Sequence, residues 1–260
     1  MARAIIAVSG KGGVGKTSIS AMVVRALCQA HPEAKVLAID ADPAIGLSSA
    51  LGVDVHATLD DIRRRIVKNV EEGEPRAAVE LLSEAKYLVF DTMVEGRDFA
   101  FLAIGRPETA GCYCAINSYL KEVISHLSES FDYVIIDGEA GVEQINRRVM
   151  EKVSHLLLVS DQSRKGFQVV NMIQGIAKDM VLYEKAGLIL NRIKEPELLE
   201  GALPEQLDLL ACISEDPHHA RNDILGNSVF DLPESSPLAC GVVEALQTLE
   251  LISQEKEVSH

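Results

Sequence analysis

The chain has 260 residues, of which 47% are hydrophobic and 25% are charged, and its formal net charge is −14. This composition is typical of a globular protein with a large core, and we expect a single domain spanning residues 1–260. No run of about eighteen apolar residues is present, so we expect no transmembrane helix, and the apolar run 4–8 is too short for a signal peptide. The acidic balance argues against nucleic-acid and membrane partners, whose binding surfaces are usually basic. We therefore expect a cytoplasmic protein with reduced cysteines.

Short apolar runs alternate with helical patterns along the chain. Residues 3–10, RAIIAVSG, predict a buried strand that ends in a glycine-rich turn. The other predicted strands are the apolar runs at residues 34–42, 86–94, 98–105, 131–137, 154–161, 186–193 and 207–213. Helices are predicted at residues 16–30, 58–85 with a break at Gly73–Pro75, 118–127, 166–181 and 238–253.

This alternation predicts an α/β fold, a mostly parallel sheet with helices on both faces. Sheets of this kind bind ligands at the carboxyl ends of their strands. Polar or glycine residues stand at or just beyond four predicted strand ends, namely Gly10, Asp42, Asp137 and Asn191. We therefore expect these residues along one edge of the molecule.

The segment GKGGVGKT, Gly10–Thr17, fits the pattern of a phosphate-binding loop between a strand and a helix. Its glycines let backbone amides turn towards phosphate oxygens, and the following helix offers its positive end. Lys16 is placed to reach the β- and γ-phosphates, and the Thr17 hydroxyl is placed to bind Mg²⁺. The residues predicted to contact the nucleotide here are Gly12, Gly13, Val14, Gly15, Lys16, Thr17 and Ser18.

Lys11 makes the match to a phosphate-binding loop more specific. The segment KGGVGKT resembles the deviant phosphate loop of the superfamily that contains MinD, ParA and the nitrogenase iron protein. The resemblance implies that Lys11 crosses a dimer interface and contacts the nucleotide of the partner subunit. Such a lysine would stabilise charge on the transferred phosphoryl group, so a nucleotide-sandwich homodimer is implied.

The same resemblance implies roles for polar residues at the strand ends. Asp42 would orient or deprotonate the attacking water, and Asp40 would support the site. Asn191 would read adenine, which favours ATP over GTP. Without the resemblance, the Asp-x-Asp-Pro segment that contains Asp40 and Asp42 could equally be a simple turn.

Two further features near the expected site are less specific. Asp137 suits an outer-shell magnesium contact and a γ-phosphate sensor, and Asp91 at the end of a similar apolar run is the alternative. Gly138, which follows Asp137 and would let the next loop move, favours Asp137. The loop SEDPHH is expected to border the base, with His218 and His219 in solvent.

Two cysteines stand one residue apart, at Cys112 and Cys114. A tetrahedral thiolate site needs four ligands, so a symmetric partner would have to supply the other two. From the spacing alone, the pair could instead be small buried residues or a labile disulfide. Cys28, Cys212 and Cys240 lie in apolar patterns and are expected to pack in the core.

The segment AIGRPETAGCYC, followed by DGEAGVEQINRR, resembles the CooC-type ATPases that mature nickel enzymes such as carbon monoxide dehydrogenase, and their relatives that serve acetyl-CoA synthase. The resemblance runs from the phosphate loop to about residue 192. It implies a Ni²⁺ or Zn²⁺ site formed by Cys112 and Cys114 of both subunits. It also implies a metallochaperone that hydrolyses ATP, dimerises on binding ATP or metal, and promotes nickel insertion into a nickel–iron–sulfur client enzyme.

Two other functions stay open. A partition or positioning ATPase of the MinD/ParA type would have no metal role, but it would need a basic surface or a membrane-binding tail, and the C-terminal LELISQEKEVSH is short and acidic. An electron-transfer protein with a bridging iron–sulfur cluster would resemble the nitrogenase iron protein. In that family each subunit contributes two widely separated cysteines rather than a Cys-x-Cys pair.

Overall fold

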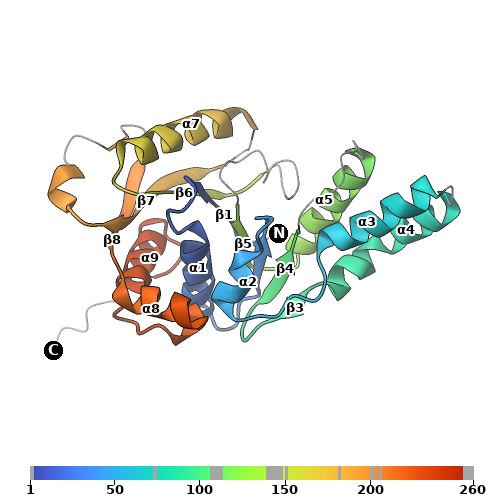
Figure 1. The fold of residues 1–260 in the computed structure, drawn as a ribbon, viewed down its shortest axis with the longest axis horizontal. Coiled ribbons are helices and arrows are strands. Elements are labelled where there is room, and N and C mark those ends of the chain that lie inside the picture. The colour runs from blue at the N-terminus through green and yellow to red at the C-terminus, as the bar shows by residue number, and fades with distance from the viewer. Residues whose placement is uncertain are drawn as a thin grey trace.

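The computed structural model describes residues 3–72, 75–105, 114–138, 149, 152–180, 183–199, 203–204 and 207–253. They form an α/β fold in which helices cover both faces of a central sheet (Figure 1). This confirms the predicted fold class. Within these ranges, the helices are all too short or too polar to cross a membrane.

The sheet orders the eight strands of the described residues as β3-β4-β2-β5-β1-β6-β7-β8. All neighbours pair in parallel except β3 with β4. Because β1 lies between β5 and β6, its carboxyl end is in the middle of one edge of the sheet. The strands are β1 (Ala4–Gly10), β2 (Val36–Asp40), β3 (Val94–Glu95), β4 (Ala100–Ala103), β5 (Tyr133–Asp137), β6 (His155–Ser160), β7 (Lys185–Ile193) and β8 (Asp208–Ser214).

Two hydrophobic cores lie on opposite faces of the sheet. One contains Ile6 and Val8 of β1, and the other contains Ala7 between them, because alternate side chains of a strand point to opposite faces. The first core is closed by α1 (Lys16–Ala30), α2 (Gly46–Leu51), α9 (Pro237–Thr248) and the short helix η2 (Val229–Asp231). The second is closed by α3 (Leu59–Glu71), α4 (Pro75–Asp91), α5 (Cys114–Ser128) and α7 (Arg164–Met180), with the short helix η1 (Pro196–Leu199) at its margin.

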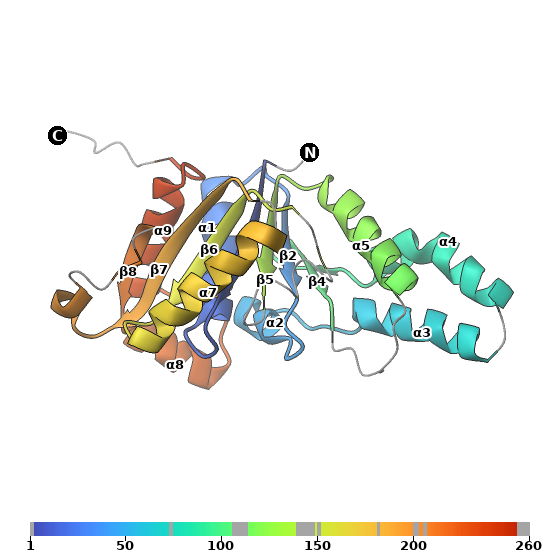
Figure 2. The same ribbon diagram turned by 90° about the horizontal axis from the view of Figure 1, so that it is seen from above.

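The helices α3 and α4 project together beyond the sheet (Figure 2). The first turn of α3 is fixed by a capping box, in which Thr58 and Asp61 each bond the other's backbone N–H. The predicted break at Gly73–Pro75 falls between the two helices, although residues 73 and 74 lie outside the described ranges.

The strand predicted at residues 86–94 is wrong, because α4 continues through this run to Asp91. Ala85 and Val89 face the core, while Tyr87 and Phe90 are 74% and 64% exposed. This spacing is helical rather than alternating, and only Val94–Glu95 remains as strand β3. Asp91 is therefore an exposed residue at the end of α4 rather than an acid at a strand end, which removes the reason for considering it as the magnesium contact.

The expectation for the cysteines is confirmed only for Cys28, which is buried in α1. Cys212 and Cys240 are exposed, so their predicted core positions are wrong. Cys212 lies on the edge strand β8, where Ala211 and Ile213 take the buried positions. Cys240 lies on the solvent side of α9, next to the buried Ala239.

The end of β1 gives the first prediction. A Cβ at Gly10 would lie 2.1 Å from the backbone carbonyl oxygen of Val159, its partner on β6. Since neither strand can move without breaking the sheet, Gly10→Ala should lower the free energy of unfolding by roughly 2–3 kcal/mol. Urea denaturation measures this change.

Gly175→Ala in α7 is the matched control, because nothing lies within 4 Å of its added Cβ. This substitution should raise the free energy of unfolding by about 0.5–1 kcal/mol. Equal stabilities of the two variants would contradict the proposed close approach at Gly10.

Candidate functional site

The turn from β1 into α1 has the geometry of an anion-binding loop. Gly13 and Gly15 have left-handed backbone angles, with φ of 81° and 91°, and Gly15 is the N-cap of α1. A Cβ at Gly15 would lie 2.6 Å from the Asn191 side-chain nitrogen, so any other residue would strain the left-handed backbone and displace this amide. Backbone N–H groups at such a turn, together with the helix N-terminus behind them, attract phosphate.

Lys16 is the first residue of α1 and is only 9% exposed. Its ammonium donates a hydrogen bond of 3.3 Å to the carbonyl oxygen of Lys11, so it folds back over the loop. A phosphate oxygen would give a shorter, charge-assisted bond. When a nucleotide binds, the Lys16 ammonium can therefore exchange the Lys11 carbonyl oxygen for a phosphate oxygen.

Three carboxylates lie beside the loop, and the strand-end pattern had placed two of them, Asp42 and Asp137, at this edge. Asp40 and Asp137 are paired across the neighbouring strands β2 and β5, and Asp42 follows Asp40 by two residues. Asp40 accepts hydrogen bonds from the backbone N–H groups of Asp42 at 3.0 Å and Leu47 at 2.8 Å. Its carboxylate thus fixes the chain that carries Asp42, which is itself half-buried.

Burial, with Asp137 beside it, raises the pKa of Asp40 to about 7. Burial likewise raises the pKa of Asp137 to about 6, although hydroxyl groups of Thr17 and Ser20 and the ammonium of Lys16 favour its charged form. Desolvation therefore outweighs these favourable contacts. Ionising both buried carboxyl groups costs free energy, because each loses contact with water and the two negative charges repel each other.

The two oxygens of the Asp137 carboxylate differ in their hydrogen bonds. Oδ1 accepts a hydrogen bond of 2.8 Å from Ser20, but Oδ2 is buried and has no hydrogen-bond partner among the described residues. Buried carboxylate and hydroxyl oxygens are the donors that Mg²⁺ prefers. The Asp137 carboxylate and the Thr17 hydroxyl therefore fit a magnesium ion, which would also offset the repulsion with Asp40.

Lys11 is held within its own chain. Its ammonium lies 2.8 Å from Oδ2 of Asp161, just beyond β6, and 3.4 Å from the hydroxyl of Ser163. Partial burial opposes ionisation of Asp161, but hydrogen bonds from Lys11 and Ser163 outweigh it and lower the pKa of this carboxyl. Lys11 was expected at the site, whereas Asp161 was not, although it ends an apolar run with the same local pattern as Asp137.

The end of β7 also reaches the phosphate loop. The side-chain amide of Asn191 donates to the carbonyl oxygen of Val14 at 2.9 Å, and its oxygen accepts the N–H of Arg192. The guanidinium of Arg192 donates to the carbonyl oxygen of Gly13 at 3.0 Å. Asn191 thus lies at the expected edge, where it already holds the loop, and Arg192 was not anticipated.

The two histidines lie on α8 (Pro217–Leu225) rather than in a loop. His218 is exposed as expected, but the expectation is wrong for His219, which is half-buried. The His219 ring nitrogen Nε2 lies 2.8 Å from the hydroxyl of Ser18, in the first turn of α1. Burial lowers the pKa of His219, so the neutral ring is favoured beside the loop.

The predicted thiolate site lies outside the described residues. Cys112 falls in the range 106–113, and Cys114 is the first residue of α5 with no description of its side chain. Within the described ranges there is no group of three or more His, Cys, Asp and Glu side chains suited to a metal ion.

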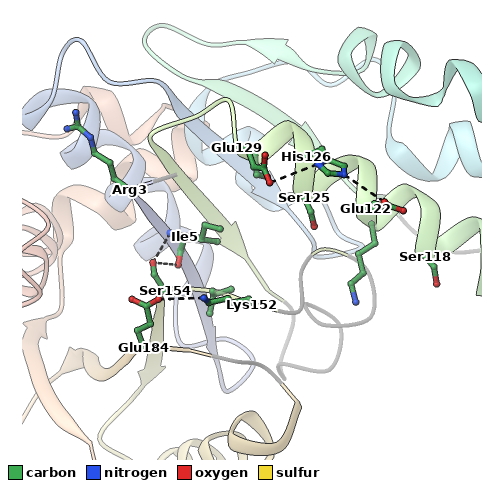
Figure 3. A pocket seen from close by; sticks show the side chains of 13 residues that line it. Arg3, Ile5, Ser118, Glu122, Ser125, His126, Glu129, Lys152, Ser154 and Glu184 are labelled. Carbon is green, nitrogen blue, oxygen red and sulfur yellow. Dashed lines mark hydrogen bonds and ion pairs between the residues drawn. The ribbon is translucent and has the colours of Figure 1, made fainter. Parts of the chain in front are cut away.

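A cavity of about 610 Å³ lies at the opposite end of the strands (Figure 3). It is bounded by one face of α5 and by the residues just before β6 and β7. A surface ion pair lines it, with Lys152 3.9 Å from Glu184, and His126 lies 3.8 Å from Glu122. Because no phosphate-loop residue reaches this cavity, it is separate from the nucleotide site.

Fold and phosphate loop together define a P-loop ATPase. Residues 2–183 match the protein family described as an AAA domain, and the chain belongs to this family. Within it, the chain is an ATP hydrolase of the MinD/ParA superfamily.

The similarity extends over whole chains. An uncharacterized ATP-binding protein of Methanocaldococcus jannaschii is 33% identical, covering 94% of this chain and 98% of its own. The carbon monoxide dehydrogenase accessory protein CooC of Rhodospirillum rubrum is 30% identical, covering 98% of this chain and 99% of its own. Among solved structures, the septum site-determining protein MinD of Pyrococcus horikoshii complexed with Mg-ADP has a TM-score of 0.66 and 25% identity, with 96% of each chain covered.

The paired acids predict a pH dependence of stability. The folded-state pKa of Asp137 is raised, so its contribution to stability is full below about pH 4 and is lost as the pH rises through about 6. Asp137→Asn removes this loss. In nucleotide-free protein, the variant should therefore gain on the order of 1–2 kcal/mol relative to wild type between about pH 5 and pH 8.

Asp161→Asn is the control, because the pKa of Asp161 is shifted in the opposite direction from that of Asp137. Because the pKa of Asp161 is lowered, its contribution is present above the unfolded value and is lost only at more acidic pH. The stability difference between this variant and wild type should stay constant over the same pH range. Denaturant titrations in EDTA measure both, and a flat difference for Asp137→Asn would show that its pKa is not raised.

Proposed function

We propose that this ATPase is a metallochaperone that binds Ni²⁺ or Zn²⁺ and promotes nickel insertion into carbon monoxide dehydrogenase or acetyl-CoA synthase. The observation that carries the proposal is the 30% identity to CooC over 98% of the chain, together with the Cys-x-Cys pair at Cys112 and Cys114. It acts in the cytoplasm, where reducing conditions keep both thiols available for metal.

The ATP chemistry is assigned to residues at the carboxyl edge of the sheet. Lys16 binds the β- and γ-phosphates. Asn191 holds the loop through the Val14 carbonyl, and the resemblance to the superfamily also assigns it the reading of adenine. Asp42 orients or deprotonates the attacking water, with Asp40 fixing its backbone through the 3.0 Å bond. Thr17 would bind Mg²⁺ directly and Asp137 would contact it through its outer shell, and the ion would supply charge neutralisation at the phosphates.

In this proposal ATP draws two subunits into a homodimer. Each Lys11 leaves Asp161 and contacts the nucleotide of the partner subunit. The exchange favours the dimer, because the ammonium gives up one carboxylate at 2.8 Å and gains a more highly charged phosphate. Hydrolysis and phosphate loss then favour the return of Lys11 to Asp161, which loosens the dimer.

The position of α5 supports a link between the nucleotide and the metal. The chain leaves β4 beside Asp40, where the N–H of Ile104 donates to the Asp40 carbonyl oxygen at 2.8 Å. Cys112 follows Ile104 by eight positions in the sequence. Movements of the Asp40–Asp42 segment on ATP binding therefore reach the thiolates through a short segment, with a typical coupling of roughly 1–3 kcal/mol.

A partition or positioning ATPase is the second candidate. MinD of Bacillus subtilis is 27% identical over 226 residues, covering 87% of this chain, which favours this function. A positioning ATPase would not require Cys112 and Cys114. The net charge of −14 gives it no general attraction to DNA or anionic lipid.

Anaerobic metal titration separates the two candidates. Purified protein is titrated with Ni²⁺ or Zn²⁺, with and without a non-hydrolysable ATP analogue, and the mass is followed by light scattering. The metallochaperone should bind one metal per two chains, and Cys112→Ser with Cys114→Ser should abolish binding. Cys212→Ser with Cys240→Ser is the matched control, since it removes two exposed thiols elsewhere. Binding that survives loss of the Cys-x-Cys pair, or a chain that stays monomeric with metal and nucleotide, would reject the proposal.

Lys11 provides a test of the dimer mechanism. Lys11→Ala should keep nucleotide affinity but slow hydrolysis by about 10³-fold, the effect of losing a charge supplied in trans. Asp161→Asn releases the ammonium, so dimers should form at several-fold lower protein concentration in ATP. Single-turnover hydrolysis and analytical ultracentrifugation measure these effects.

Lys152→Ala is the matched control, because it removes a lysine from an ion pair at the opposite end of the sheet. Normal turnover in Lys11→Ala would refute a role across the interface.

A further inference from the structure

Two consecutive backbone carbonyl groups of the phosphate loop accept hydrogen bonds from side chains outside the loop. The carbonyl oxygen of Gly13 accepts from the Arg192 guanidinium at 3.0 Å, and that of Val14 accepts from the Asn191 amide at 2.9 Å. Both anchors come from adjacent residues at the carboxyl end of β7. Neighbouring residues of a regular strand could not do this, because their side chains point to opposite faces.

An irregularity in β7 allows the two side chains to share one target. Leu190 pairs with Cys212 and Ile193 pairs with Ser214, so β7 has one residue more than β8 over this stretch. Arg192 takes up the extra residue in a left-handed conformation, with φ of 58°. A bulge of this kind re-aims a side chain, and a left-handed residue other than glycine costs free energy that the surroundings must offset.

The anchored carbonyls set the direction of two N–H groups. The described residues contain no cis peptide bond, and in a trans peptide the C=O of one residue points opposite to the N–H of the next. Fixing the Gly13 and Val14 carbonyls therefore fixes the N–H groups of Val14 and Gly15. These N–H groups are therefore turned away from β7, and backbone N–H groups of such a loop are the donors that bind phosphate.

We propose that Arg192 is a positioning residue for phosphate binding. By holding the Gly13 carbonyl, it keeps the Val14 N–H aimed at the phosphate before the nucleotide arrives. The strained backbone at Arg192 is the geometry that brings the guanidinium to this carbonyl. The role concerns the phosphates rather than the base, and it does not depend on the proposed metal site.

Arg192→Gly tests the proposal without straining the fold. Glycine accepts the left-handed backbone, so the variant should melt at or above the wild-type temperature. Loss of the anchor should weaken ADP binding about tenfold, the effect of about 1.4 kcal/mol. Inosine diphosphate differs from ADP only in its base, so its affinity should fall by the same factor. Isothermal titration calorimetry with both nucleotides measures these changes.

Glu250→Gly is the matched control. Glu250 is another left-handed residue with a charged side chain, with φ of 62°, and it lies after α9 away from the loop. This variant should match Arg192→Gly in melting temperature but bind ADP as wild type does. Arg192→Lys, which keeps the charge but not the planar fork, should recover only part of the affinity.

Three results would overturn the proposal. Unchanged ADP affinity in Arg192→Gly would remove any role in binding. A weaker affinity accompanied by a fall in melting temperature would make Arg192 a purely structural residue. A loss for ADP that differs from the loss for inosine diphosphate would assign Arg192 to base recognition.

Discussion

The phosphate loop leaves β1 at Gly10, where the backbone passes so close to the Val159 carbonyl that no side chain fits. The central position of β1 in the sheet makes this contact possible, since β5 and β6 flank it on both sides. From this fixed point the chain turns through Gly13 and Gly15 into α1, whose helix is buried in the core almost all round. The nucleotide site is thus anchored to the most rigid part of the molecule.

Around this loop the structure concentrates charge that it does not neutralise. Asp40 and Asp137 are buried beside each other, and the raised pKa of both shows that desolvation prevails over their hydrogen bonds. A protein selected for stability alone would not keep two acids in this position. Among the described residues, one oxygen of Asp137 has no hydrogen-bond partner, and the Mg²⁺ ion of the proposed nucleotide complex would supply one.

The cations of the site, by contrast, are already engaged. Lys16 bonds the Lys11 carbonyl, Lys11 pairs with Asp161, and Arg192 holds Gly13. Each contact keeps a positive group near the loop while no phosphate is present to attract it. The loop is therefore preorganised for binding, which reduces the free energy that nucleotide binding must spend on ordering it.

The sequence alone determined the fold class, the phosphate loop and the strand-end acids, because each depends on local residue patterns. Hydrophobic periodicity identified α1 to the residue, but it mistook the end of α4 for a strand, since a short apolar run fits either structure until its packing is known. It also missed the exposure of Cys212 and Cys240, because a pattern does not show which face of an edge strand or outer helix stays uncovered. Asp161, Arg192 and His219 joined the site only through tertiary structure, which brings together residues some 150 to 200 positions apart in the chain.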